Sequence, residues 1–259
     1  MARTEHPGHA GPPGHAGHPA RTGPSGPSGR SGPRLAALAA LLADDTRAVF
    51  CLALLDGRAW TAGELARYAG VAPSTASEHL GKLIAGGLLA QERQGRHRYV
   101  RFADPRAAHL VEDLAAHTTP PEEPPRTLRA AGATNAMARG RTCYDHLAGR
   151  LGLAITDALT VRGLLRQDTG FALTDRGVAW FGEQGIGLER TGRRPLVRSC
   201  LDWTERKPHL AGVAGAALCR HALDTGWCVR IGSERAVKVT ECGERELYER
   251  LGIEPGILR

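Results

Sequence analysis

This 259-residue chain lacks long apolar runs, and no apolar core follows its first residues. A membrane-spanning helix needs about 20 predominantly apolar residues, and a secretory signal needs a shorter apolar core near the N-terminus. We therefore expect a soluble, cytoplasmic protein that does not contact a membrane. A GxSxG nucleophile motif and a glycine-rich phosphate-binding loop are also missing, so the sequence gives no support to the commonest hydrolase and nucleotide-binding sites.

Paired cysteines are absent too. The six cysteines are scattered along the chain without a CxxC pair. This spacing argues against a zinc ribbon and against a disulfide-rich secreted scaffold.

The net charge of +7 is compatible with nucleic-acid binding. The charge is unevenly distributed, however, because residues 34–118 carry ten Lys and Arg against nine Asp and Glu. An argument for DNA binding must therefore depend on where individual side chains lie.

Residues 1–33 are a low-complexity segment of Gly, Pro, His and Ser, which we expect to be a disordered tail. It contains two His-x-x-His pairs, His6/His9 and His15/His18. Such imidazoles can bind nickel or zinc loosely, but a flexible tail without a ligand is the favoured interpretation.

Residues 61–102 have the pattern of a helix, a tight turn, a second helix and a hairpin. Thr61 and Glu64 have capping-box spacing, and Gly70 ends the first helix. Pro73 suits the first turn of the second helix, which ends at Gly86. The turn at Gln94-Gly95 then joins two strands that end at Phe102.

The second of these helices has one apolar stripe, so its short polar residues are expected to face outward. A helix of this kind fits the major groove of double-stranded DNA, and arginines of the adjacent hairpin can neutralise phosphates. The predicted DNA contacts are Ser74, Thr75, Ser77, Glu78, His79, Lys82, Arg93, Arg96 and Arg98.

Three stretches carry a resemblance: SerThrAlaSerGluHisLeuGlyLysLeu, GlyGlyLeuLeu and GlyArgHisArgTyrVal, within 74–100. Together they resemble the ArsR/SmtB family of winged helix-turn-helix repressors, over about 35–117. The resemblance implies a homodimer assembled through helices at 34–42 and 104–118. It also implies an inverted-repeat operator and release of the DNA by an effector, whose identity the sequence does not give.

The metal motifs known in that family are not intact. Arg106 stands where a histidine would follow Asp104, and Ala66 and Tyr68 stand where the first helix of the motif would carry cysteines. We therefore expect the three polar residues of the helix after the hairpin to form a solvated face: His109, Glu112 and His117.

Residues 119–134 are predicted to be a linker, and residues 135–259 contain a duplication. ArgThrCysTyrAsp and HisLeuAlaGly in 141–149 recur as ArgSerCysLeuAsp and HisLeuAlaGly in 198–212, so the copies span about 141–186 and 198–253. Each copy is expected to be a helix plus a hairpin that resembles a winged helix. The predicted fold class is thus mainly α with small β wings, with a sensory or dimer-supporting module after the DNA-binding domain at 34–118.

The repeated Arg-x-Cys-x-Asp motif leaves several interpretations open. If the copies face each other, a zinc- or cadmium-like divalent ion is a candidate ligand of Cys143, Asp145, His146, Cys200, Asp202 and His209. Alternatively, Cys143 and Cys200 form a redox-active dithiol. An organic effector could instead bind among Tyr144, Trp180, Phe181 and Trp203. The plainest alternative, and the favoured one, is a helix-start motif whose cysteine lies in the core.

A different class of function is a thiol enzyme fused to a DNA-binding domain, with Cys143 and His146, or Cys200 and His209, as nucleophile and base. No oxyanion-hole motif and no third orienting residue accompany these pairs. The sequence therefore predicts a DNA-binding transcriptional regulator and not an enzyme.

Overall fold

A computed structural model describes residues 32–95, 97–118, 128–168, 170–189, 192–232 and 235–258. The histidine pairs predicted in the tail and the DNA contact predicted at Arg96 lie outside these residues. Among the helices of the described ranges, none has both the length and the apolar character needed to cross a membrane.

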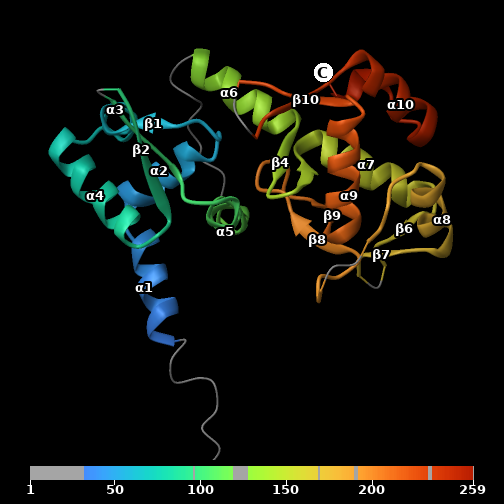
Figure 1. Ribbon diagram of the computed structural model, residues 1–259, viewed down its shortest axis with the longest axis horizontal. Coiled ribbons are helices and arrows are strands. Elements are labelled where there is room, and N and C mark those ends of the chain that lie inside the picture. Colours follow the sequence, from blue (N-terminus) through green and yellow to red (C-terminus); the bar gives the residue numbers. More distant parts are fainter. Residues whose placement is uncertain are drawn as a thin grey trace, which may run out of the picture.

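The N-terminal domain is a winged helix-turn-helix (Figure 1). Its elements are α1 (Gly32–Leu42), α2 (Asp45–Leu54), β1 (Trp60–Thr61), α3 (Ala62–Ala69), α4 (Pro73–Ala85), β2 (Leu89–Gln94), β3 (His97–Phe102) and α5 (Pro105–Ala116). The three strands form one antiparallel sheet of order β1-β3-β2. The predicted helix, turn, helix and hairpin are confirmed, and only the short strand β1 was not predicted.

Local sequence explains where these helices begin. The Thr61 side chain accepts from the Glu64 backbone N–H while Glu64 Oε2 accepts from the Thr61 backbone N–H, which confirms the capping box. Asp44 and Asp104 cap α2 and α5 by a single hydrogen bond each, which their side chains accept from the backbone N–H of Arg47 and of Ala107. Gly70 ends α3 with a φ of 69°, a left-handed conformation that glycine adopts without strain.

The C-terminal module, residues 128–258, starts with helix α6 (Leu128–Arg139) and then repeats one arrangement twice. The first copy comprises β4 (Arg141–Cys143), β5 (His146–Ala148), α7 (Gly149–Val161), β6 (Leu165–Arg166), β7 (Ala172–Leu173) and α8 (Asp175–Glu183). The second comprises β8 (Arg198–Leu201), β9 (Pro208–Ala211), α9 (Gly212–Asp224), β10 (Cys228–Arg230), β11 (Val237–Val239) and α10 (Glu241–Leu251), followed by the 3-10 turn η2 (Pro255–Leu258). The predicted duplication of a helix-plus-hairpin unit is confirmed.

Each copy also has a leading hairpin that the sequence analysis did not predict, β4-β5 in the first and β8-β9 in the second. The motif His-Leu-Ala-Gly-x-x-Gly explains how each hairpin meets the next helix. A Cβ atom at Gly152 would lie 2.4 Å from the Leu147 carbonyl oxygen, and one at Gly215 would lie 2.5 Å from that of Leu210. Only glycine lets each helix approach its hairpin so closely.

The two copies exchange contacts across the module. Helix α9 packs on β5, α7 packs on β9, and β5 lies against β9. The Leu210 backbone N–H donates to Thr156 Oγ1 of the other copy (2.9 Å), and the Gly149 N–H at the start of α7 donates to Asp202 Oδ2 (2.7 Å). The two hairpins therefore face each other in the centre of the module, as Figure 1 shows near the labels β4, β8 and β9.

Three expectations need correction. The segment predicted as a linker at 119–134 already contains the first residues of α6. The Arg-x-Cys-x-Asp motifs are not helix starts, because Cys143 and Cys200 lie in strands β4 and β8. The predicted solvated face of α5 is wrong for Glu112, which is only 2% exposed and faces the C-terminal module, and for His109, whose side chain is 18% exposed, whereas His117 is exposed as predicted.

Candidate DNA interface and metal centre

Helix α4 presents the polar face that was expected to contact DNA. Ala76, Leu80 and Leu83 are buried in the domain core, which leaves the opposite side of the helix to solvent. On that side Ser74 and Ser77 are exposed, and Thr75 is half-buried. An exposed α4 with short polar side chains has the shape and chemistry that the major groove accepts.

The side chains of the remaining predicted DNA contacts on α4 differ in how accessible they are to DNA. Lys82 Nζ and Glu78 Oε1 form an exposed ion pair (2.7 Å) that solvent or a phosphate can replace. The His79 side chain is only 15% exposed, and its Nδ1 lies 3.3 Å from Asp44 Oδ1. His79 therefore packs against the start of α2, and among the predicted contacts of α4 it has the least structural support.

The hairpin β2-β3 forms the wing. Arg93 and Arg98 are paired across its two strands, and both side chains are exposed. Two exposed guanidinium groups on one wing suit contacts with phosphates beside the groove.

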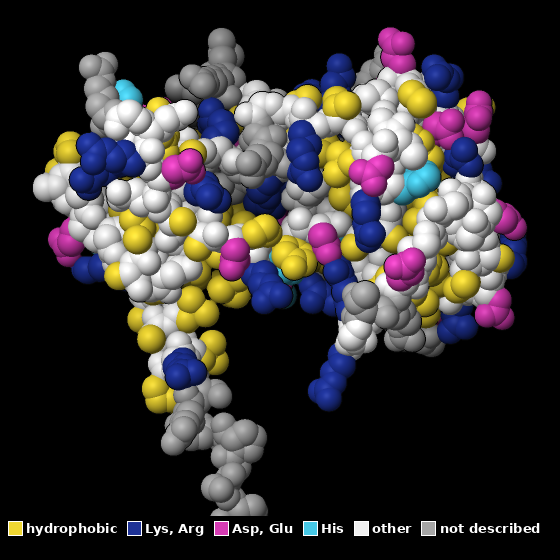
Figure 2. Space-filling model, in the orientation of Figure 1, with side chains coloured by type: hydrophobic (Ala, Val, Ile, Leu, Met, Phe, Trp, Pro, Cys, Tyr) yellow, Lys and Arg dark blue, Asp and Glu magenta, His cyan; other side chains and the backbone are white. Residues whose placement is uncertain are grey.

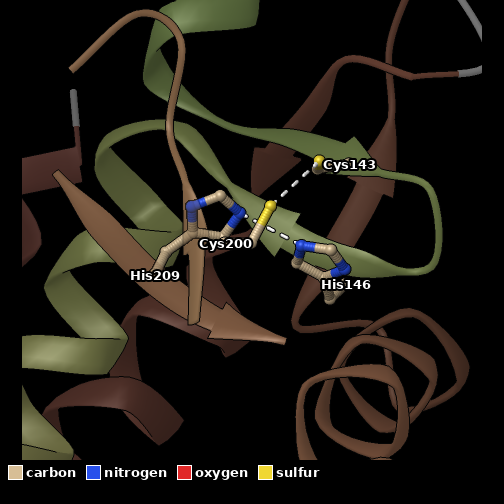
Figure 3. A group of neighbouring side chains, drawn as sticks. All are labelled: Cys143, His146, Cys200 and His209. Atoms are coloured by element: carbon tan, nitrogen blue, oxygen red, sulfur yellow. Dashed lines mark hydrogen bonds between the residues drawn. The ribbon is translucent and has the colours of Figure 1, made fainter. Parts of the chain in front are cut away.

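The two facing hairpins of the C-terminal module bring four potential metal ligands together: Cys143, His146, Cys200 and His209. Cys143 is paired with His146 across β4-β5, and Cys200 with His209 across β8-β9. All four side chains are buried, and their ligand atoms lie within 4.8 Å of one another (Figure 3). We call this set the Cys2His2 cluster.

The distances in the Cys2His2 cluster match a tetrahedral site. The two sulfur atoms are 3.9 Å apart, and the two Nε2 atoms are 3.1 Å apart. A tetrahedral zinc ion with ordinary bond lengths would hold its two sulfurs about 3.8 Å apart and its two nitrogens about 3.3 Å apart. The residues present are therefore compatible with a zinc-like ion in these two distances, and their ligand atoms all lie within 4.8 Å of one another.

Carboxylates stand behind both histidines. Asp145 Oδ1 lies 3.5 Å from His146 Nδ1, and Asp202 Oδ2 lies 3.8 Å from His209 Nδ1, whose nitrogen is buried without a hydrogen-bond partner. At His146 this is the arrangement in which an outer carboxylate orients a metal-bound imidazole, while the carboxylate of Asp202 lies beyond hydrogen-bond distance of His209. The prediction that both aspartates are ligands is corrected, because they lie behind the two histidines and outside the Cys2His2 cluster.

Each aspartate is fixed by an arginine of the same module. Arg194 makes two contacts with Asp145, at 2.5 and 2.8 Å, and the guanidinium of Arg141 lies 3.0 Å from Asp202. Burial opposes ionisation, but Arg194 lowers the pKa of Asp145 and Arg141 lowers the pKa of Asp202. Both carboxylates are therefore charged.

The two thiols titrate as a pair. The hydrogen bond between the sulfurs lowers the pKa of Cys200 and raises the pKa of Cys143, which burial raises further. Burial opposes the positive form of His146, but hydrogen bonds to Asp145 and Cys200 raise its pKa. These shifts favour the Cys143 thiol as the donor and the Cys200 sulfur as the acceptor of the hydrogen bond between them.

The aromatic residues considered for an organic effector do not gather in one place. Trp180 and Phe181 belong to the core of the C-terminal module. Trp203 packs against the core of the N-terminal domain, and Tyr144 lies beside His109. The structure therefore does not assemble the predicted aromatic pocket.

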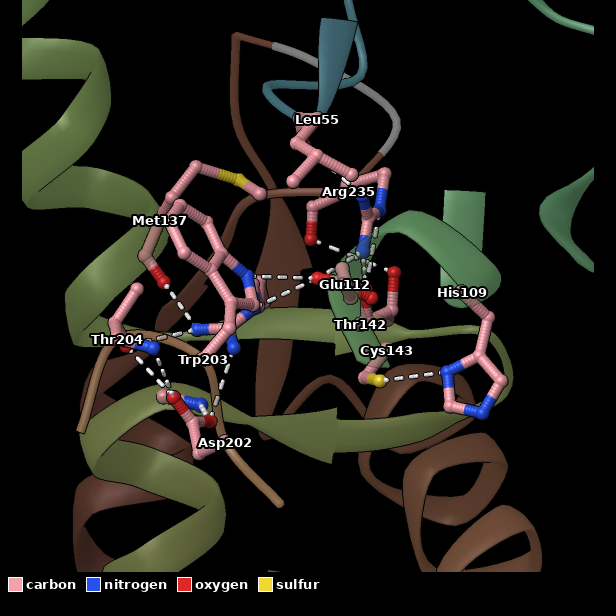
Figure 4. A network of polar contacts seen from close by, with 12 residues as sticks. Leu55, His109, Glu112, Met137, Thr142, Cys143, Asp202, Trp203, Thr204 and Arg235 are labelled. Atoms are coloured by element: carbon pink, nitrogen blue, oxygen red, sulfur yellow. Dashed lines mark hydrogen bonds and ion pairs between the residues drawn. The ribbon is translucent and has the colours of Figure 1, made fainter. Parts of the chain in front are cut away.

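A polar network joins the two domains, and the sequence analysis missed it. Oε1 of the buried Glu112 on α5 lies 2.6 Å from Arg235 Nη2, 2.9 Å from Trp203 Nε1 and 3.2 Å from Arg141 Nε (Figure 4). Arg235 Nη1 also donates to the Leu55 carbonyl at the end of α2 (3.0 Å). The only sequence signal was the His109-x-x-Glu112 spacing, which we assigned to solvent.

Some known proteins are similar to part of this chain, and one is similar to most of it. Residues 42–92 match the family described as a helix-turn-helix domain. Over 222 residues the chain is 39% identical to YdfF of Bacillus subtilis (strain 168), an uncharacterized HTH-type transcriptional regulator, covering 85% of this chain and 97% of YdfF. It is also 38% identical over 80 residues to the HTH-type transcriptional regulator CmtR of Mycobacterium tuberculosis (strain H37Rv), covering 31% of this chain and 67% of CmtR. The NMR structure of CmtR, a cadmium metal-sensor, shares 32% identity at a TM-score of 0.29, over 36% of this chain and 99% of that chain.

Fold and comparisons together define a DNA-binding protein with a winged helix-turn-helix of the ArsR/SmtB type and a duplicated C-terminal module. The chain belongs to the family of HTH-type transcriptional regulators. The prediction of a DNA-binding transcriptional regulator is thus confirmed.

Proposed function

We propose that this regulator is a homodimeric repressor whose affinity for its operator is set by a divalent metal ion at the Cys2His2 cluster. The observation that carries the proposal is the convergence of four buried ligand atoms within 4.8 Å of one another, with a charged carboxylate behind each histidine. Two thiolates and two imidazoles select zinc or a softer ion such as cadmium. The likeness to CmtR, itself named as a cadmium sensor, supports this choice of ions.

Exposed apolar residues support the homodimer. No residue of α1 is buried, and Leu35 is 67% exposed. Figure 2 shows α1 projecting from the molecule with hydrophobic side chains on its surface. Leu114 on α5 is 48% exposed as well. Burying these residues against a second copy would remove apolar area from water, and two α4 helices would then read an inverted repeat about one helical turn apart.

The test is fluorescence anisotropy of the metal-free, reduced protein on DNA from upstream of its own gene, with and without one equivalent of Cd(II) or Zn(II) per chain. We expect the ion to change the DNA affinity at least about fivefold, the lower end of common coupling between two sites. Sedimentation equilibrium of the same sample should give the mass of two chains. A bound ion that leaves DNA affinity unchanged would make the cluster a purely structural site and defeat the proposed regulation.

A second candidate for the effector is an oxidant, because the Cys143 and Cys200 sulfurs lie 3.9 Å apart and Cys200 is a thiolate. A disulfide requires approach to about 2.05 Å. Its formation would transfer two electrons and release the remaining thiol proton, with a peroxide as the electron acceptor. A hydrogen peroxide titration in the same assay separates the candidates, since bound zinc should protect both sulfurs from oxidation.

Burial also favours a regulator over a thiol enzyme. Cys143 is 2% exposed and Cys200 is 3% exposed, so neither sulfur is open to a substrate. An enzyme should show one thiol that iodoacetamide alkylates far faster than the others. We expect both cluster thiols to react slowly while the protein is folded.

Mutations of the wing and of α4 should have different effects on DNA binding. Arg98→Ala removes an exposed charge of β3, so it should weaken binding to operator and random duplexes alike and lower the salt dependence by about one phosphate contact. Ser77→Ala should mainly reduce discrimination between sequences, by about 1–3 kcal/mol per lost base contact. If Arg98→Ala left both the DNA affinity and its salt dependence unchanged, the wing would not contact DNA.

A further inference from the structure

We propose that His109, on α5 of the DNA-binding domain, is the positioning residue through which metal occupancy of the Cys2His2 cluster changes DNA affinity. This inference rests on the proposed function, because it requires that the cluster bind an ion. Its starting observation is a contact between domains: His109 Nδ1 lies 3.3 Å from the sulfur of Cys143. A side chain of the DNA-binding domain thus hydrogen-bonds a ligand atom of the other domain.

The imidazole of His109 is held from both sides. Its Nδ1 faces Cys143 of β4, while its Nε2 lies 3.0 Å from Arg198 Nη2 of β8 and 3.4 Å from Asp113 Oδ2 of α5. His109 therefore contacts the first strand of each hairpin, and these are the strands that carry the two cysteines. Its side chain is only 18% exposed, so its orientation is set by these neighbours.

The contact with Arg198 indicates which nitrogen of His109 bears the proton. A guanidinium can only donate, so Nε2, which lies nearer to Arg198 (3.0 Å) than to Asp113 (3.4 Å), is assigned as the acceptor and Nδ1 as the nitrogen that carries the proton. Nδ1–H then donates to the sulfur of Cys143. The DNA-binding domain thus offers a hydrogen-bond donor to one of the four ligand atoms.

Metal binding would fix the acceptor of this hydrogen bond. An ion held by the four ligand atoms of the Cys2His2 cluster would hold the Cys143 sulfur in one position relative to His146, Cys200 and His209. Because His109 contacts Cys143 of β4 and Arg198 of β8, the ion would restrain α5 against both hairpins. Because α5 packs on α2 and β3, the effect can reach the wing. Coupling of this kind is reciprocal, so DNA must change the metal affinity by the same factor.

His109→Leu tests the proposal because it removes both ring nitrogens while keeping an apolar body of similar size. Zinc affinity is measured by competition with a chromophoric chelator, and DNA affinity by anisotropy with and without zinc. We expect the zinc affinity to fall by about 10- to 100-fold, as for outer-shell partners, so DNA affinity is measured at a zinc concentration that saturates each variant. The zinc-free DNA affinity should be retained, and the ratio of DNA affinities with and without zinc should fall toward one.

Three further variants complete the design. His109→Asn keeps a donor near the position of Nδ1 and should retain most of the wild-type ratio. His117→Leu makes the same change at an exposed residue at the end of α5 and should retain all of it. Arg198→Leu removes the exposed side chain that contacts Nε2 of His109. It should reduce the ratio of DNA affinities with and without zinc, and it provides a second test if His109→Leu does not fold.

The outcomes separate the inference from the proposed function. If wild-type protein binds zinc and responds to it, and the ratio is unchanged in His109→Leu and Arg198→Leu, the role of His109 is wrong while metal regulation stands. If wild-type protein binds zinc but its DNA affinity does not respond, the proposed function itself is wrong. Hydrogen exchange gives an independent measurement: zinc should slow exchange of the α5 amides in wild type and not in His109→Leu.

Discussion

Cys200→Ser is expected to lower the affinity of the protein for Zn(II) by at least about a thousandfold. Loss of an outer-shell partner commonly costs 10- to 100-fold in metal affinity, so loss of a ligand should cost more. Cys200 is also the sulfur with the lowered pKa, so it offers a thiolate before the ion arrives. Zinc affinity by chelator competition and the thiolate-to-metal absorption of the cadmium complex both measure the effect.

The matched control is Cys242→Ser, which makes the same change at a partly exposed cysteine of α10, outside the Cys2His2 cluster. It should leave zinc affinity unchanged. In wild type the pKa of Cys143 is raised, so each bound ion should displace about one thiol proton and affinity should rise about tenfold per pH unit below that pKa. Equal zinc affinity of Cys200→Ser and wild type would place the bound ion somewhere other than this cluster.

The sequence predicted the DNA-binding domain well because its signals are local. The capping box at Thr61 and Glu64, the proline at the start of α4 and the Gln94-Gly95 turn each act within a few residues. The arrangement of α3, α4 and the wing then follows from one apolar stripe on each helix.

The candidate metal ligands could be predicted only in part, for a reason of geometry. The repeated motif identified Cys143, His146, Cys200 and His209 as a set, but the sequence could not place the aspartates relative to them. Arg194 binds Asp145, and Arg141 binds Asp202. Each arginine lies far in sequence from the aspartate that it binds, so the position of each aspartate depends on a tertiary contact. The leading hairpins were missed because a three-residue strand such as β4 carries almost no periodic pattern.

The joint between the domains was mispredicted because it depends entirely on tertiary contacts. His109 and Glu112 have the spacing and polarity of an exposed helix face. The C-terminal module covers this face with arginines that follow Glu112 by 29 and 123 positions, Arg141 and Arg235. In the sequence alone, Glu112 has the pattern of a surface residue, because charged residues are rarely buried without a partner and its two guanidinium partners are known only from the fold.

Glu112→Gln is expected to destabilise the protein by about 3 kcal/mol at neutral pH. The substitution removes the charge that compensates two guanidinium groups, and breaking a buried ion pair from one side leaves charge without a partner in a poorly solvated place. Arg141 is fully buried and, among the described residues, keeps only Asp202 as an ion-pair partner, while Arg235 loses a contact of 2.6 Å. Urea unfolding of the full chain followed by tryptophan fluorescence reports the loss, since the Trp203 indole donates to the same carboxylate.

The pH dependence of this difference has a definite sign. Burial opposes ionisation, but Arg235 and Arg141 lower the pKa of Glu112 in the folded state. The stabilisation is therefore fully present above the pKa of the unfolded chain and is lost as the pH falls through the folded-state pKa. Wild type and Glu112→Gln should converge in stability on acidification.

The same change in the exposed Glu92–Arg101 pair, Glu92→Gln, should cost less than about 1 kcal/mol at any pH. If Glu112→Gln cost as little as Glu92→Gln, the carboxylate would not hold the two domains together, and α5 would lack the rigid joint that a signal from the cluster requires.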